Sequence, residues 1–211
     1  MKPILFSTEM VRAILDNRKS QTRRVVKTPG GNPVGVKLPE MGFAFGGKII
    51  GEPGNKDNPY GFMTPLGIVR PQYDISDILY VRETWAAQHS YDHLPPRLIP
   101  SYPAMQFHYA ATEERGGLLW RPSIFMPRHV ARIFLKVVNI RVERLQEISE
   151  SDAGAEGLRI GIGGLPYFSC RDAYAGLWNS IYAKRNGGIY AWESNPWVWI
   201  YEFKRHFINQ Q

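Results

Sequence analysis

Glycine and proline gather in one stretch of the chain, and this clustering limits the fold more than any other feature. Residues 28–75 hold ten of the 20 glycines and seven of the 16 prolines. Both residue types interrupt helices and strand interiors, so the stretch favours loops and short strands. Apolar residues still recur through it, which argues against a disordered linker. We predict an insertion or flap at residues 28–75, with one hairpin formed by 43–45, a Gly46–Gly47 turn and 48–50.

Outside this insertion, short apolar segments predict strands, and few segments have helical spacing. Strands are expected at residues 4–6, 78–81, 106–110, 130–145 and 197–203. Helices are expected after Ser7–Thr8, after Ser149 and over 173–181, because hydroxyls cap helix starts and apolar residues then recur at helical spacing. A second loop insertion is expected at 88–120. Many strands with few helices predict an α+β fold: a small mixed sheet or barrel with helices at its openings.

The composition is that of a single globular domain over residues 1–211. Hydrophobic residues make up 44% of the chain and charged residues 21%, which excludes a wholly disordered chain. No stretch approaches the roughly 20 unbroken apolar residues of a membrane helix, and the first residues are too soon polar for a signal peptide. Cys170 is the one cysteine, so an internal disulfide and a cysteine-based zinc site are excluded. We expect a cytoplasmic protein with no membrane partner.

Positive charge is concentrated near the start of the chain. The formal net charge is +7, and residues 1–36 contain seven Lys or Arg against two Asp or Glu. A focused positive field attracts phosphate, nucleotides or nucleic acid. A solvated basic surface has the same composition, so charge alone leaves both interpretations open.

Residues 17–24 combine a lysine, a hydroxyl and clustered cations in the order Asn-Arg-Lys-Ser-Gln-Thr-Arg-Arg. In an extended segment Thr22 and Arg24 point the same way, with Lys19 three residues before Thr22. Neighbouring cations lower the pKa of a lysine, and such a lysine can act as a general base on a hydroxyl. A solvated basic loop or a phosphate clamp fits the same residues.

Residues 150–157 form the second candidate segment, with two carboxylates at helical spacing. Asp152 and Glu156 are four residues apart and share one face of a helix. A carboxylate beside a basic pocket can hold the lysine or shuttle protons, although a capped surface helix gives the same pattern. His89 and His93 are also four apart, but their Pro- and Tyr-rich surroundings disfavour a helix, and we expect no metal site there.

The first of these segments resembles the Gly-x-Lys-Thr-type motif of the ASCH domain, in the PUA-like superfamily. Further segments resemble the same family in order: Asp77–Val81 its Gly-Asp-x-Leu-x-Val strand, residues 145–158 its acidic short helix, and residues 199–204 its closing strand. The longer form, with residues 21–24, 82–85 and 195–197, resembles ASCH-like proteins common in phages and prophages. The insertions at 28–75 and 88–120 lie outside the resemblance.

The resemblance implies a small β-barrel with helices at its mouth and a cleft for a nucleobase or RNA. One branch, the small bacterial N(4)-acetylcytidine amidohydrolases, uses a lysine, a threonine three residues on and a glutamate in the acidic helix. Those positions fall on Lys19, Thr22 and Glu156. Asn17 replaces the usual glycine of the motif and Ser20 the commoner threonine.

The expected activity is therefore removal of an acyl group from the exocyclic amine of N(4)-acylated cytosine or cytidine, without metal or cofactor. Lys19 would be the general base, and Thr22 the nucleophile or the group that positions water. Glu156 would hold Lys19 and later help to protonate the leaving amine. Arg24, or backbone N–H groups near the start of the helix at Thr8, would stabilise the oxyanion. Glu83 and Trp85 are the candidate pyrimidine contacts. The alternatives are an RNA-binding ASCH module and a ribonuclease that uses Lys19 and Glu156 as acid and base.

Overall fold

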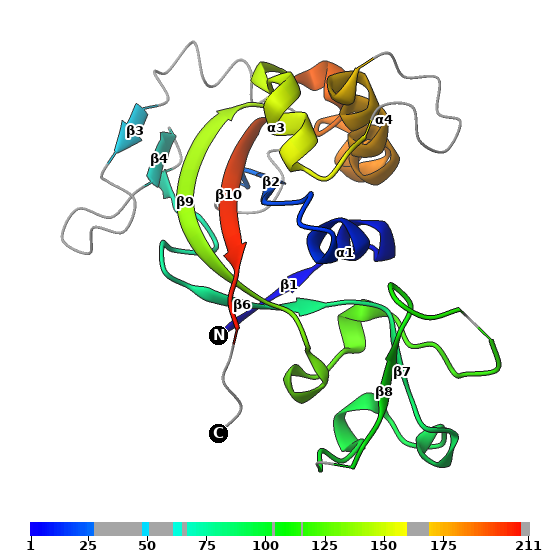
Figure 1. Ribbon diagram of the computed structural model, residues 1–211. Helices are drawn as coiled ribbons and strands as arrows, with labels where there is room; N and C mark the ends of the chain where they lie inside the picture. Colours follow the sequence, from blue (N-terminus) through cyan, green and yellow to red (C-terminus); the bar gives the residue numbers. More distant parts are fainter. Residues whose placement is uncertain are drawn as a thin grey trace. The chain divides into compact units, whose positions relative to one another are not determined.

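The structure is a computed structural model that describes residues 1–27, 48–50, 61–64, 67–102, 104–114, 116–159 and 169–207 (Figure 1). The chain divides into two compact units. The first unit consists of Met1–Asn17, Asp77–Lys136 and Lys204–Gln211, and the second of Arg18–Ser76 and Val137–Phe203. No helix in the described ranges is long and apolar enough to cross a membrane.

A five-stranded mixed sheet is the main β structure. Its strands are β1 (Lys2–Leu5), β2 (Gln21–Val25), β6 (Ile78–Arg82), β9 (Phe134–Arg144) and β10 (Trp197–Arg205), in the order β1-β6-β9-β10-β2. The β1–β6 pair is parallel, whereas the β6–β9 and β10–β2 pairs are antiparallel. β9 and β10 are the two long curved ribbons of Figure 1. Among the described strands this order does not close, so an α+β fold with a mixed sheet is shown and a barrel is not.

The first unit contains the helix that the Ser7–Thr8 cap predicts. α1 spans Thr8–Leu15, and the Ser7 hydroxyl accepts a hydrogen bond from the backbone N–H of Met10. After the helix, Asn17 has a φ of 57°, a left-handed conformation that asparagine tolerates. Further along the chain, β7 (Trp85–Ala87) and β8 (Phe107–Tyr109) form an antiparallel pair in the same unit. The described residues of this unit also form four 3₁₀ helices: His89–Tyr91, Pro96–Leu98, Ser123–Phe125 and Arg128–Val130.

Part of the predicted insertion forms a small sheet in the second unit. β3 (Lys48–Ile50), β4 (Gly61–Thr64) and β5 (Gly67–Val69) pair antiparallel in sequence order. The expected strand at 43–45 and its Gly46–Gly47 turn lie outside the described residues. β3 pairs with β4, with Lys48 opposite Met63, so the sequence analysis missed β4 and β5 as its partners. These strands are short, with glycine inside or beside them, and periodicity is weak over so few residues.

The described part of the second unit contains two helices and three short 3₁₀ turns. α3 (Glu150–Ala155) begins at Ser149, whose hydroxyl accepts from the N–H of Asp152, as the sequence predicts. α4 spans Cys170–Tyr182. The Glu150 carboxylate accepts hydrogen bonds from the N–H groups of Cys170 and Arg171, at 2.9 and 3.2 Å, and so ties the start of α4 to α3. The 3₁₀ turns are Leu145–Glu147, Arg185–Gly188 and Trp192–Ser194.

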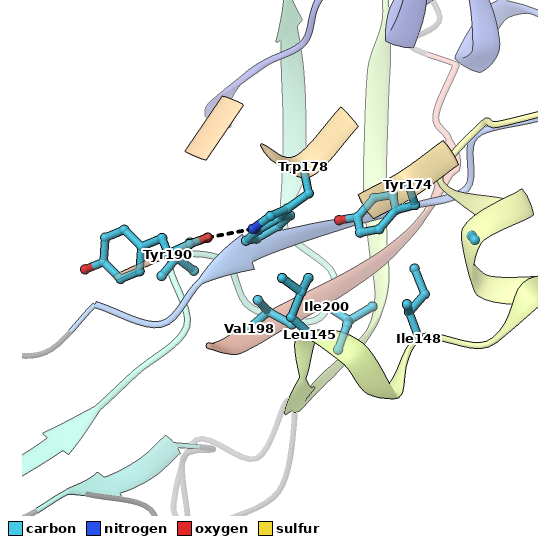
Figure 2. Packing of buried hydrophobic residues seen from close by; sticks show 9 residues of the cluster. Leu145, Ile148, Tyr174, Trp178, Tyr190, Val198 and Ile200 are labelled. Atoms are coloured by element: carbon cyan, nitrogen blue, oxygen red, sulfur yellow. Dashed lines mark hydrogen bonds between the residues drawn. The ribbon is translucent and has the colours of Figure 1, made fainter. Parts of the chain in front are cut away.

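Aromatic residues of α4 form the core of this unit. Figure 2 shows Tyr174 and Trp178 on α4 facing Val198 and Ile200 of β10. The Trp178 indole N–H donates to the carbonyl of Tyr190 at 2.7 Å, which satisfies its polar atom inside the core (Figure 2). Burial of several large aromatic and aliphatic side chains supplies the main stabilisation here. This packing fixes α3, α4 and the strand pair β2–β10 relative to one another.

Candidate active site

A buried ion pair joins the start of β2 to the end of α3. The Lys19 ammonium donates to the Glu156 carboxylate at 2.7 Å and to the backbone carbonyl of Glu156 at 2.9 Å. The side chains are 0% and 3% exposed. The backbone holds the two segments together independently, because the N–H of Ser20 donates to the carbonyl of Ala155 at 2.9 Å. The position of Lys19 is therefore set by main-chain contacts as well as by its charge partner.

The burial of Lys19 changes its acid–base behaviour. Desolvation lowers the pKa of Lys19 below its ordinary value, and this effect outweighs the opposing attraction and hydrogen bond of Glu156. Repulsion from Arg24 and Arg23 lowers this pKa further. A lysine in these surroundings gives up its proton more readily than an exposed one, which a general base requires.

Arg23 is the second buried cation of the site. Its guanidinium donates to Glu156 at 3.2 Å, to Glu143 at 2.7 Å and to Asp152 at 3.2 Å. The Tyr174 ring lies 5.8 Å from the guanidinium carbon. Glu156 therefore accepts hydrogen bonds from two cations at once, one on each carboxylate oxygen. Because arginine keeps its proton at all relevant pH values, Arg23 remains a charged partner of Glu156 whatever the protonation state of Lys19.

Further charged residues surround this pair and balance it. Arg141 donates to Asp152 at 3.0 and 3.1 Å and also contacts Glu202. Burial would raise the pKa of Asp152, but Arg141 and Arg23 outweigh it and hold this pKa below the usual range. We call the set of Lys19, Arg23, Arg141, Glu143, Asp152 and Glu156 the charge cluster. It contains three cations and three carboxylates, so the buried charges are compensated.

Thr22 and Arg24 lie on the other face of β2, because side chains alternate along a strand. Thr22 is buried and stands opposite Tyr201 of β10, while Arg24 stands opposite Trp199. Directly opposed residues share a face, so these four side chains belong to one surface. The Lys19 ammonium is hydrogen-bonded to Glu156. In the described part of the chain, no hydrogen bond joins Lys19 to Thr22.

A pocket of about 280 Å³ opens on that surface, within the second unit. We call it the cationic pocket, and its described lining consists of Arg24, Val25, Lys27, Val69, Arg70, Gln72, Tyr182, Arg185, Tyr190, Trp199 and Tyr201. The Tyr201 hydroxyl accepts from the N–H of Gln72 at 2.9 Å, and the Tyr201 ring packs edge-on against Tyr73. Lys19, Thr22 and Glu156 are not among the described lining residues, although Arg24 lies on β2 together with Thr22.

Glu83 and Trp85, the expected pyrimidine contacts, lie in the first unit. The Glu83 carboxylate is 1% exposed and accepts two hydrogen bonds from Arg132, at 3.0 and 3.1 Å. Burial raises the pKa of Glu83, with Arg132 opposing the shift. Trp85 is completely buried in the core of this unit, and the guanidinium carbon of Arg121 lies 5.5 Å from its ring. Both side chains are occupied by contacts within their own unit.

Sequence reasoning missed most of the residues that surround Lys19 and Glu156. Arg141 and Glu143 carry a signal, because they are two apart in an alternating strand and so share a face. Arg23 was expected only as a cation beside Lys19, and its carboxylate partners are far away in the sequence. The pocket residues Arg70 and Arg185 carry no signal. Among the described residues, no group of three or more His, Cys, Asp or Glu side chains is arranged to hold a metal ion.

Comparison with known proteins gives the chain no relative: no protein-family model matches it, no curated protein matches it, and no solved structure matches it.

Proposed function

We propose that the chain is an amidohydrolase that removes acyl groups from the exocyclic amine of N(4)-acylated cytosine or cytidine, on a PUA-like barrel of the ASCH type. One observation carries the proposal. Lys19 is a fully buried lysine with a lowered pKa, in contact with the Glu156 carboxylate and three residues before the hydroxyl of Thr22. A base, a carboxylate that orients it and a hydroxyl are the parts that acyl transfer needs, and Thr22 would have to approach Lys19 when the substrate binds.

In the proposed reaction, the free amine of Lys19 accepts a proton from Thr22, or from water that Thr22 positions. The oxygen attacks the acyl carbonyl, and Arg24 stabilises the oxyanion. The carbon–nitrogen bond then breaks, and the proton passes from Lys19 to the departing amine. The lone pair of that amine is drawn into the pyrimidine ring, so it leaves more easily than an alkylamine. Where Thr22 is the nucleophile, water hydrolyses the acyl-threonine and releases the carboxylic acid.

Glu156 has two tasks in this scheme. It holds the amine of Lys19 in a fixed position through the 2.7 Å contact, and it stabilises the ammonium that forms when Lys19 takes up the proton. The proton transfer from Thr22 requires the two side chains to approach directly or through one water. Such contacts commonly tighten only when the substrate binds.

A non-catalytic RNA-binding module is the second candidate, and the cationic pocket favours it. Cationic side chains that line one hollow are typical of surfaces that bind a phosphate backbone. This candidate requires no proton transfer. It therefore predicts that the chain binds RNA and releases no product.

The test is release of cytidine from N(4)-acetylcytidine, followed by ultraviolet absorbance. We expect turnover by the wild type and a loss of about a hundredfold or more in Lys19→Met, Thr22→Val and Glu156→Gln, since each removes a group that transfers or holds the proton. Lys184→Met is the matched control, because Lys184 is exposed and lies outside the charge cluster and the pocket lining. Circular dichroism confirms that each variant folds. Absence of turnover by the wild type, with acetyl and with larger acyl groups, would contradict the proposal.

A further inference from the structure

Lys19 and Arg23 share the carboxylate of Glu156, and each cation binds a different oxygen. The Lys19 ammonium donates to Oε2 at 2.7 Å, and the Arg23 guanidinium donates to Oε1 at 3.2 Å. Both cationic side chains are 0% exposed, and the Glu156 side chain is 3% exposed. One carboxylate carries a single negative charge, so Glu156 balances only one of the two buried cations.

Arg23 is also held by contacts that do not involve Glu156. Its guanidinium donates to Glu143 of β9 at 2.7 Å and to Asp152 of α3 at 3.2 Å. The Gln21 amide, two residues earlier on β2, donates to the backbone carbonyl of Asp152 at 2.7 Å and so ties this face of β2 to α3. The rigid fork of a guanidinium suits several acceptors in fixed positions. The place of Arg23 beside Glu156 therefore does not depend on Lys19.

The second cation matters when Lys19 gives up its proton. A neutral amine keeps two N–H groups, which is enough for the contacts of Lys19 with the carboxylate and the backbone carbonyl of Glu156. Glu156 then keeps Arg23 as a charged partner. Without Arg23, loss of the same proton would leave an ionised carboxylate in the interior with no cation bound to it among the described residues. Because this is strongly unfavourable, Lys19 would retain its proton.

Repulsion between the cations acts in the same direction. Desolvation is the largest cause of the lowered pKa of Lys19, and the charges of Arg24 and Arg23 lower it further, against the attraction of Glu156. The other charged or titratable groups of this network are Arg141 and Glu143 of β9, Asp152 of α3, Tyr174 of α4 and Glu202 of β10. Burial raises the pKa of Tyr174 well above its ordinary value, so Tyr174 remains uncharged. The arginines keep their charge, whereas Lys19 is a cation that can lose its own.

We propose that Arg23 is a positioning residue that acts through Glu156: it remains the cation of this carboxylate, so that Lys19 can release its proton. Arg23 does this without touching a substrate, because it binds the oxygen of Glu156 that Lys19 does not bind. The use of the resulting amine as a general base rests on the proposed function. The protonation of Lys19 itself can be measured with no substrate present.

Nuclear magnetic resonance titration of the lysine side chains tests this inference without hydrolysis. In Arg23→Met the pKa of Lys19 should rise by about one unit or more, because Lys19 becomes the main cationic partner of Glu156. Arg23→Lys restores a cation beside three carboxylates and should bring this pKa back toward the wild-type value. Arg144→Met is the matched control. Arg144 is a buried arginine of the same unit that lies outside the charge cluster, and its loss should leave the titration of Lys19 unchanged.

Glu143→Gln keeps the inference testable if Arg23→Met fails to fold, which circular dichroism shows. The Glu143 side chain is 18% exposed, so this change disturbs less buried structure. It removes one negative charge from around Arg23, which then acts more strongly on Glu156. The pKa of Lys19 should therefore fall, by less than about one unit. A loss of packing alone does not produce shifts of opposite sign in Glu143→Gln and Arg23→Met.

The rate of hydrolysis should follow the titration. In Arg23→Met the pH at which kcat/KM for N(4)-acetylcytidine reaches half its maximum should rise together with the pKa of Lys19. At neutral pH we expect kcat/KM to fall about tenfold. KM should change less than kcat, since Arg23 acts through Glu156 and does not bind the substrate.

An unchanged or lower pKa of Lys19 in Arg23→Met, no fall in Glu143→Gln, or an equal shift in Arg144→Met would overturn the inference. The proposed function fails separately. Titrations that shift as expected, in a protein that hydrolyses no N(4)-acylated cytidine, contradict the amidohydrolase alone. Hydrolysis by the wild type, together with an Arg23→Met variant whose Lys19 pKa and pH profile match the wild type, contradicts the positioning role alone.

Discussion

Each unit of the molecule contains a buried pair of a carboxylate and a cation, and the two pairs differ in the cation. In the first unit Glu83 pairs with Arg132, whose side chain is 28% exposed. In the second unit Glu156 pairs with Lys19, and both side chains are almost fully buried. The Arg132 guanidinium binds both oxygens of Glu83 and also lies 3.9 Å from the Tyr109 ring centroid.

The difference in cation separates a structural contact from a site that can transfer a proton. Arginine cannot lose its proton in a protein, and its planar fork suits a fixed, two-point contact. Lysine carries a compact charge that burial readily neutralises. Desolvation acts on both units, but it raises the pKa of Glu83 in one and lowers the pKa of Lys19 in the other. Only the second pair includes a cation that can serve as a base.

Replacing Lys19 by arginine makes the second pair resemble the first. Of the changes considered, this one should have the largest effect, and the effect is on catalysis. Lys19→Arg keeps the positive charge beside Glu156 but cannot accept a proton, so we expect kcat/KM for N(4)-acetylcytidine to fall about a thousandfold. Lys19→Met should lose a similar factor. Arg132→Lys is the reciprocal change in the first unit and should leave kcat/KM close to that of the wild type. Substantial activity in Lys19→Arg would show that the pair is structural.

Removing the carboxylate from each pair should have the next largest effect, this time on stability. Glu83→Ala leaves Arg132 charged and without its main partner, and we expect a loss of about 2–3 kcal/mol in the free energy of unfolding. Glu156→Ala should cost less, about 1–2 kcal/mol, because Lys19 can become neutral and Arg23 keeps Glu143 and Asp152. Urea unfolding followed by tryptophan fluorescence measures both. If Glu156→Ala loses more free energy of unfolding than Glu83→Ala, the contrast between the two pairs is contradicted.

The pH dependence of stability should have opposite signs in the two units. The raised pKa of Glu83 gives stability that is full below the ordinary glutamate pKa and is lost as pH rises through the folded-state value. The lowered pKa of Lys19 means that stability increases as pH rises from the folded-state value to the ordinary lysine pKa. The free energy of unfolding is measured with urea over a series of pH values. In Glu83→Gln it should change less with pH in the acidic range, and in Lys19→Met it should change less in the alkaline range. If the variants have the same slopes of unfolding free energy against pH as the wild type, Glu83 and Lys19 do not cause these changes.

Local signals in the sequence predicted much of the fold. Ser7 and Ser149 begin the helices that their hydroxyls predict, and Asn17 adopts the left-handed conformation that ends α1. The aliphatic and aromatic run of β10 forms a strand where expected. β9 covers Phe134–Arg144 of the expected 130–145, because a 3₁₀ helix over Arg128–Val130 comes before it. In each case the determining contacts lie within a few residues or on one face of a single element. Periodicity and capping chemistry depend on such contacts alone.

The surroundings of the candidate site could not be predicted in the same way. Arg23 contacts Glu143 and Glu156, which lie 120 and 133 residues further along the chain. The cationic pocket likewise collects side chains from β2, the residues after β5, and the turn after α4. Glu83 and Trp85, the expected pyrimidine contacts, depend on distant residues in the same way. Arg132 binds the Glu83 carboxylate, and Trp85 lies in the core of the first unit.

The central claim, that Lys19 is a base poised by burial, is tested most directly by its own titration. Nuclear magnetic resonance of protein labelled at the lysine side-chain carbon next to the amine reports each lysine across about pH 6 to 11. The Lys19→Met variant assigns the Lys19 signal by its disappearance. We predict that Lys19 loses its proton at a lower pH than every exposed lysine, and that Glu156→Gln lowers its pKa further by removing the opposing charge. A Lys19 signal that titrates together with the exposed lysines, or at a higher pH, would contradict the account.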